Sequence, residues 1–201
     1  MLPVFVIADA SGSMAHETKI DALNFGIRDL LDASATAFDE APTAVAVIAF
    51  GKEPAHVALP LTAAPSARWR DLVPEGRSPI GSAIDLARTM IEAHANDSPD
   101  SLRPMLVLAS DGSPTDDWRS ALQRLDASAI AGCADRMALA IGPDADLDML
   151  AAFVKLDNRR LLQAGCERDI LDFFRHLQLR PHGGAAQSFD DPAPPDPAQI
   201  A

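Results

Sequence analysis

The sequence has few basic residues. Lysine and arginine together number 17 against 29 aspartates and glutamates, which gives a formal net charge of −12. Sequence-independent binding to nucleic acid needs a basic patch that neutralises phosphates. An anionic membrane surface likewise attracts basic segments rather than acidic ones. The composition therefore argues against a nucleic-acid partner and against docking on a membrane.

Cysteine and long apolar runs are also scarce. The two cysteines, Cys133 and Cys166, lie far apart and have neither a CxxC pattern nor a histidine at metal-ligand spacing. We interpret them as buried, reduced thiols. No apolar run approaches the ~18 residues that span a bilayer. The first basic residue is Lys19, so the opening segment lacks the positive region of a signal peptide. We expect a cytoplasmic protein.

The sequence does have enough apolar residues for a sizeable core: 48% of its 201 residues are hydrophobic and 23% are charged. Continuous apolar runs, typical of strands buried on both faces, alternate with segments of helical period. This alternation predicts an α/β fold, a doubly wound and mostly parallel sheet with helices on both faces. The predicted strands lie in 3–8, 43–51, 56–62, 104–109, 133–142 and 159–165, and the helices in 20–31, 84–91, 118–125, 145–154 and 167–179.

One domain accounts for residues 1–180. The remaining segment, 181–201, is rich in proline and poor in large apolar residues, so we expect a disordered tail. Within the domain, Pro60 cannot donate a ladder hydrogen bond, which indicates that the strand at 56–62 lies at an edge of the sheet.

Oxygen-bearing side chains follow three of the predicted elements at the sheet edge where ligands of doubly wound folds bind. The first loop offers Asp9, Ser11 and Ser13, the second offers Ser78, and the third offers Asp111. Convergent oxygens without histidine or cysteine suit a hard cation, and Mg²⁺ best, since it takes about six oxygen ligands. The sequence therefore predicts a Mg²⁺ site, with Mn²⁺ or Ca²⁺ as open alternatives.

Each element of this set has a simpler interpretation. Asp9, Ser11 and Ser13 are also compatible with an Asx-type turn that caps a helix. Ser78 alone is compatible with an ordinary loop residue before a helix. Asp116 and Asp117 follow the third loop, and we interpret both as helix N-terminal carboxylates stabilised by the helix dipole rather than as metal ligands.

The segment "DASGSM" resembles the D-x-S-x-S motif of von Willebrand factor A domains, in which it forms the metal ion-dependent adhesion site (MIDAS). "SPIGSAI" and "LASDGSPTDD" resemble that family's second and third loops, and the resemblance covers residues 3–178. It implies that Ser11 and Ser13 bind the metal directly and that Asp9 acts mainly through water. It also implies that Ser78 supplies a hydroxyl where the family usually has threonine, and that Asp111 is the last carboxylate.

Catalysis is not supported by the motifs. "DASGSM" lacks the glycines of a G-x-S-x-G nucleophile elbow, and an aspartyl-phosphate phosphatase would need an aspartate at position 11. Neither GxGxxG nor a Walker loop is present. We therefore expect a docking module rather than an enzyme, with a metal-dependent hydrolase as the least favoured alternative.

Among von Willebrand factor A proteins, the chain is most similar to bacterial TerY-like proteins, which are associated with tellurium resistance and stress. That resemblance implies a partner that supplies an Asp or Glu to the metal, and signalling with a protein-phosphatase-2C-like enzyme and a Ser/Thr kinase. The alternative that remains open is an adaptor of a MoxR-type AAA+ ATPase, which also uses small proteins of this kind. A partner with a Walker loop would favour the hypothesis of an ATPase adaptor.

Overall fold

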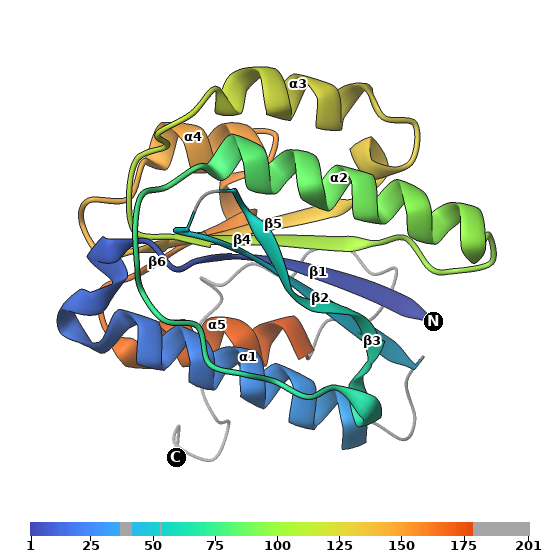
Figure 1. Ribbon diagram of the computed structural model, residues 1–201, viewed down its shortest axis with the longest axis horizontal. Helices are drawn as coiled ribbons and strands as arrows, with labels where there is room; N and C mark the ends of the chain where they lie inside the picture. The colour runs from blue at the N-terminus through green and yellow to red at the C-terminus, as the bar shows by residue number, and fades with distance from the viewer. Residues whose placement is uncertain (37–41, 53, 179–201) are drawn as a thin grey trace, which may run out of the picture.

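Six strands form one mixed sheet through the middle of the molecule, in the order β3-β2-β1-β4-β5-β6 (Figure 1). The computed structural model describes residues 1–36, 42–52 and 54–178, so the predicted tail at 181–201 and the domain boundary at 180 lie outside the described residues. All neighbouring strands are parallel except β3, which runs antiparallel to β2. The strands are β1 Leu2–Asp9, β2 Thr43–Phe50, β3 His56–Ala63, β4 Met105–Ser110, β5 Asp135–Ile141 and β6 Leu161–Ala164.

Helices cover both faces of the sheet, as the alternating pattern predicts (Figure 1). One face carries α1 Lys19–Thr36 and α5 Glu167–Gln178, and the other carries α2 Ile80–Asp97, α3 Trp118–Ala127 and α4 Leu147–Phe153. Short 3-10 turns complete the chain at Gly12–Thr18, Ala64–Ser66, Ala131–Cys133 and Asn158–Arg160. None of the helices in the described part of the chain is both long enough and apolar enough to cross a membrane.

The central strands are buried on both faces because successive side chains point to opposite sides of a strand. In β1, Val4 and Val6 belong to the core beneath α1 and α5. Phe5 and Ile7, between and beyond them, belong to the core beneath the other three helices. The continuous apolar run that predicts this strand therefore serves two cores at once.

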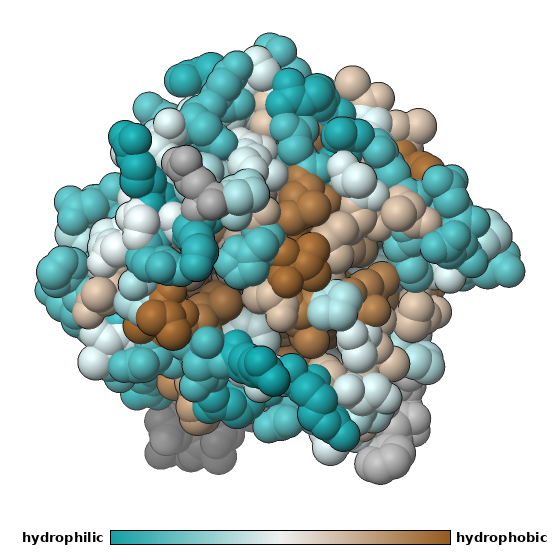
Figure 2. Space-filling model, in the orientation of Figure 1, coloured by the Kyte–Doolittle hydropathy of each residue, from teal (hydrophilic) through white to brown (hydrophobic). Residues whose placement is uncertain are grey.

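The edge strand β3 determines how the chain reaches the second predicted loop. Pro60 lies in β3 at the edge of the sheet, as the sequence predicts. Because β3 is antiparallel to β2, it ends level with the start of β1 and not with its end. The segment 67–79 then carries the chain back across the front of the molecule (Figure 1). Apolar side chains gather on this face (Figure 2), and Val57 and Val73 are 39% and 73% exposed.

The prediction that both cysteines are buried is wrong, because Cys133 and Cys166 are free and exposed. Each lies in a connection outside the sheet rather than on a core-facing stripe. Cys133 ends a 3-10 turn before β5, with Sγ 3.4 Å from the carbonyl oxygen of Ala129. Cys166 lies just before α5, with Sγ 3.3 Å from Asp169 Oδ2.

The packing of α1 on α5 predicts an unusual effect of adding a methyl group. A Cβ at Gly26, in the middle of α1, would lie 2.4 Å from Cδ2 of the buried Phe174 ring. We expect Gly26→Ala to lower the free energy of unfolding by about 1–3 kcal/mol, because overpacking exceeds the gain in helix propensity. Urea denaturation measures this. The control Ala33→Gly, at a half-buried position of the same helix, should cost about 1 kcal/mol from propensity. A Gly26→Ala protein more stable than the parent would contradict the packing.

Candidate metal centre

Asp9 lies at the end of β1 and joins two of the three predicted loops. Its Oδ1 accepts a hydrogen bond from the backbone N–H of Ser11 at 2.8 Å. Its Oδ2 accepts from Ser110 Oγ at 2.7 Å and from the N–H of Asp111 at 3.3 Å. Burial of this fully enclosed carboxylate raises the pKa of Asp9 above its usual value, and the hydrogen bonds from Ser11 and Ser110 only partly oppose that rise.

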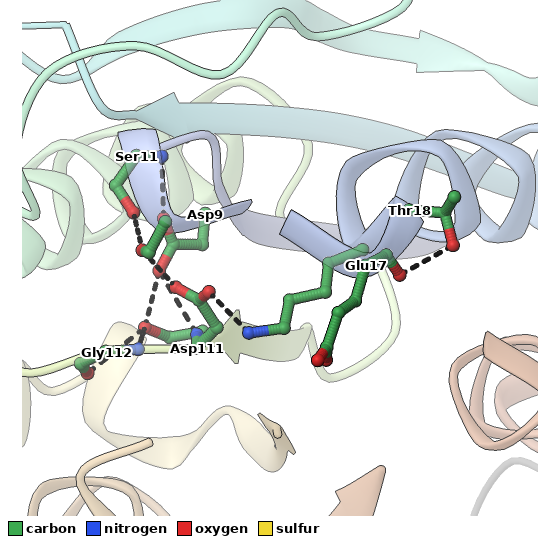
Figure 3. A network of polar contacts seen from close by, with 9 residues as sticks. Asp9, Ser11, Glu17, Thr18, Asp111 and Gly112 are labelled. Atoms are coloured by element: carbon green, nitrogen blue, oxygen red, sulfur yellow. Dashed lines mark hydrogen bonds and ion pairs between the residues drawn. The ribbon is translucent and has the colours of Figure 1, made fainter. Parts of the chain in front are cut away.

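The hydroxyls of Ser11 and Ser13 converge beside Asp111. Their Oγ atoms lie 3.0 Å apart, and Ser13 Oγ donates to Asp111 Oδ1 at 2.6 Å. Asp9, Ser11 and Asp111 lie together at the ends of their strands (Figure 3). Neighbouring ligands of an octahedral ion at ~2.1 Å are about 3.0 Å apart. The spacing of the two serine hydroxyls therefore suits adjacent positions on one Mg²⁺ or Mn²⁺ ion.

Ser78 reaches the same place from the second loop. A Cβ added to Gly112 would lie 3.9 Å from Ser78 Oγ and 4.0 Å from Ser13 Oγ. A side chain at Gly112 would thus fill the space beside both hydroxyls. The Ser78 backbone is held by its carbonyl oxygen, which accepts from the N–H of Thr115 at 2.9 Å. The structure therefore places the hydroxyls of Ser78 and Ser13 beside Gly112, at the same end of the sheet as the other three predicted residues.

Backbone hydrogen bonds fix the second loop against the first. The N–H of Gly12 donates to the carbonyl of Gly76 at 3.2 Å, and Glu75 N–H donates to the carbonyl of Ala10 at 2.8 Å. Gly76 and Gly51 adopt φ angles of +71° and +143°. A Cβ on Gly76 would lie 2.2 Å from the carbonyl oxygen of Gly51. Only glycine permits both this conformation and this close approach.

Asp116 and Asp117 act as helix caps, as predicted, but for two different helices. Asp117 is the N-cap of α3 and accepts from the N–H of Ser120 at 3.1 Å. Asp116 instead reaches α2, where its two oxygens accept from the N–H groups of Gly81 and Ser82, each at 2.8 Å. The third loop thereby holds the start of α2, and with it the loop that carries Ser78.

Two residues of the centre lie outside the set of five predicted ligands. Ser110 fixes Asp9 through its hydroxyl and lies fully buried. Lys19 places Nζ 3.1 Å from Asp111 Oδ2. One signal for Lys19 is present in the sequence: a lysine at the start of a helix is disfavoured by the helix dipole and therefore needs an acidic partner elsewhere.

The backbone that leads from the first loop, which carries Ser11 and Ser13, into α1 is strained. Glu17 and Thr18 are consecutive non-glycine residues with φ angles of +54° and +57°. Each such residue costs of order 1–3 kcal/mol, and a β-branched side chain makes it rarer. The Thr18 hydroxyl has one hydrogen to donate and lies within reach of two acceptors, the Glu17 carbonyl oxygen at 2.6 Å (Figure 3) and the carboxylate of Glu167 on α5. These contacts hold the entry to α1 in one conformation.

The donor set fits a hard divalent cation. Within residues 1–36, 42–52 and 54–178, no group of three or more His, Cys, Asp or Glu side chains comes together as a metal site. The centre depends instead on hydroxyls: Ser11, Ser13 and Ser78 would supply neutral oxygens, and Asp9 and Asp111 would supply charge. Such oxygens suit Mg²⁺ and Mn²⁺ better than metals that prefer imidazole or thiolate.

No protein-family model and no curated protein matches the sequence. Solved structures share its fold. A von Willebrand factor type A protein from Catenulispora acidiphila matches with a TM-score of 0.68 and 20% identity, over 88% of this chain and 41% of its own. Proximal thread matrix protein 1 from the mussel byssus, solved with a zinc-occupied MIDAS motif, matches with a TM-score of 0.64 and 15% identity, over 89% of this chain and 47% of its own.

The manganese-loaded TRAP protein of Plasmodium vivax matches with a TM-score of 0.59 and 13% identity, over 86% of this chain and 71% of its own. This chain spans less than half the length of the first two structures. The six-stranded, mostly parallel sheet and its helices have the fold of von Willebrand factor A domains. At these identities the likeness establishes the fold and no more.

The cap that Asp116 provides for α2 predicts a loss of stability on its removal. We expect Asp116→Ala to lower the free energy of unfolding by about 1–2 kcal/mol, because two backbone N–H groups lose a charged acceptor. Denaturant titration of the parent protein, Asp116→Ala and a control variant measures this loss of stability. The control Asp148→Ala removes an exposed carboxylate from the first turn of α4 and should cost about 0.5 kcal/mol. Equal losses in the two variants would contradict the assigned cap.

Proposed function

We propose that the chain is a protein-interaction module that binds an acidic residue of a partner through a divalent cation held by five residues. The observation that carries this proposal is the pair of serine hydroxyls, 3.0 Å apart, beside two buried carboxylates at the ends of adjacent parallel strands. The predicted ligands are Asp9, Ser11, Ser13, Ser78 and Asp111. Mg²⁺ is the ion that we propose in cells, with Mn²⁺ and Ca²⁺ as competitors for the same oxygens.

The chemistry of these ligands favours docking over permanent metal storage. Three of the five proposed ligands are neutral hydroxyls, so the ligands bring no more than two negative charges to the ion. A hydrated position on such an ion can accept a carboxylate from another protein. Neutralisation of that carboxylate supplies the energy of a metal-bridged contact. The exposure of Ser13, next to the buried Ser11, leaves one side of the centre open to a partner.

Hydrolysis is a weaker proposal for the same residues. A hydrolase would need a general acid or base beside the ion. The polar contacts around Asp9 and Asp111 run to serine hydroxyls and backbone N–H groups, and the ammonium group of Lys19 is paired with Asp111 rather than left to act as an acid or base. A serine at position 11 stands where an aspartyl-phosphate phosphatase would carry its acid. We therefore propose a non-enzymatic module.

The cellular setting rests on the sequence resemblance. We propose a cytoplasmic role in stress or phosphorylation signalling of the TerY-like kind, with a protein-phosphatase-2C-like enzyme and a Ser/Thr kinase as partners. The second candidate is an adaptor of a MoxR-type AAA+ ATPase, because that system also uses small von Willebrand factor A proteins. The nature of the partner distinguishes the two.

Metal binding is tested with Mn²⁺, which electron paramagnetic resonance detects when it is free. We expect the parent protein to bind Mn²⁺ and to melt at a lower temperature after treatment with EDTA. Asp9→Asn and Ser11→Ala should each bind Mn²⁺ at least tenfold more weakly, a loss of ~1.4 kcal/mol or more. Asp9→Asn keeps the size of the side chain while removing its charge.

The controls for metal binding are Asp144→Asn and Ser113→Ala, which change exposed residues of the same types in nearby loops. Both should bind Mn²⁺ within twofold of the parent. If Asp9→Asn and Asp144→Asn bind Mn²⁺ equally well, the five residues are not the metal site.

The docking role is tested by affinity capture from the native lysate in Mg²⁺ and in EDTA, with Asp9→Asn alongside. A partner captured only with Mg²⁺ and intact Asp9 is expected, and removing one of that partner's acidic residues should abolish capture. A kinase or phosphatase would support the signalling role, and an ATPase with a Walker loop would support the adaptor role. If the same partners are captured in EDTA and with Asp9→Asn as with the parent protein in Mg²⁺, the docking proposal is wrong.

A further inference from the structure

Lys19, the first residue of α1, lies against the metal centre without being one of its proposed ligands. Its Nζ is 3.1 Å from Asp111 Oδ2; the Lys19 side chain is 12% exposed and that of Asp111 is 0% exposed. The other oxygen of Asp111 accepts from Ser13. Asp111 is therefore shared between a hydroxyl that the metal would use and a positive charge that belongs to the chain.

The fold holds Lys19 in this place although the first turn of a helix is unfavourable for a positive charge. A positive charge in the first turn of a helix opposes the helix dipole. Space for its ammonium group comes from Gly142 at the end of β5, where an added Cβ would lie 3.2 Å from Nζ. The backbone before it passes through Glu17 and Thr18 in the left-handed region, and strain of this kind persists only where surrounding structure enforces it. The position of Lys19 is thus determined by the fold.

Lys19 changes the charge balance of the centre. With both carboxylates ionised, Asp9, Asp111 and Lys19 together carry a charge of about −1, and a divalent cation would bring the total to about +1. Two carboxylates alone would give zero with the ion. Charges buried to this degree are screened little by salt. The lysine therefore weakens the attraction for the cation and leaves a positive charge for an anionic ligand to neutralise.

We infer that Lys19 is a built-in counter-ion that couples metal binding to the binding of an acidic ligand. In the metal-free protein it neutralises Asp111. In the metal-loaded protein it repels the ion, and a single carboxylate from a partner balances the remaining charge. This inference rests on the proposed metal-dependent function and adds the coupling to it. Lys19 is a positioning residue, because it acts through Asp111 and the local field rather than by ligating the ion.

The test compares Lys19→Met with Lys52→Met, which removes the same charge from a lysine that is 70% exposed and weakly paired with Glu75. Mn²⁺ binding is titrated for each variant in chloride and in acetate at matched ionic strength, with acetate as the probe for a carboxylate ligand. In chloride we expect Lys19→Met to bind Mn²⁺ at least tenfold more tightly than the parent. Lys52→Met and the charge-conserving Lys19→Arg should stay within twofold of the parent.

A purely structural role for Lys19 would give the opposite sign, because loss of a buried partner would disorder Asp111 and weaken Mn²⁺ binding. The parent protein supplies an independent measurement that needs no variant: it should bind Mn²⁺ more tightly in acetate than in chloride, and Lys19→Met should show a smaller difference. Unchanged or weaker binding in folded Lys19→Met, or no acetate effect in the parent, overturns this inference alone. A parent that binds no Mn²⁺ overturns the proposed function as well.

Discussion

The rest of the centre depends on the buried carboxylate of Asp9. It lies at the end of β1, fully enclosed, and receives hydrogen bonds from the first loop and from the residues that end β4. Those bonds hold Ser11 and Asp111 in register, so that two loops far apart in the sequence lie side by side. Since burial raises the pKa of Asp9, the folded, metal-free protein holds its proton more tightly than the unfolded chain does. The contribution of Asp9 to stability is therefore present below about pH 3.8 and is lost as pH rises through the raised pKa of Asp9, and a bound cation would oppose that loss.

The sheet order explains why the loops meet where they do. The strand β1 lies between β2 and β4, so the strand order reverses at β1, and this is the place where ligands of doubly wound folds bind, outside the carboxyl ends of the strands. The antiparallel β3 adds a constraint of its own, because it returns the chain to the end of the strands opposite the candidate site (Figure 1). The segment 67–79 must then cross the molecule to bring Ser78 back. Its attachment through Gly76 and Glu75 to the first loop makes that long connection part of the site.

The sequence predicts the elements well because their signals are local. Each strand appears as an apolar run, and the motif order predicts that Asp9, Ser78 and Asp111 meet at one edge. What it misses depends on contacts between elements. Lys19 falls outside the apolar stripe of α1, and although its place at a helix start indicates an acidic partner, the sequence does not identify Asp111 as that partner. Asp116 appears to cap the helix that follows it, although the folded loop turns it towards α2. The cysteines also show that composition alone does not place a residue in the core.

The charge of the whole chain and the charge of the centre act in opposite directions on an acidic partner. A net charge of −12 repels such a partner at long range and attracts divalent cations towards the protein. The positive charge that Lys19 and a bound ion would create acts only at contact distance, between the three loops that carry the proposed ligands. Recognition of a carboxylate would then be slow to begin and specific once made, because only a partner that reaches the ion gains anything. Salt screens long-range repulsion more than a buried attraction, so moderate ionic strength would favour the encounter if the proposed partner also carries a net negative charge.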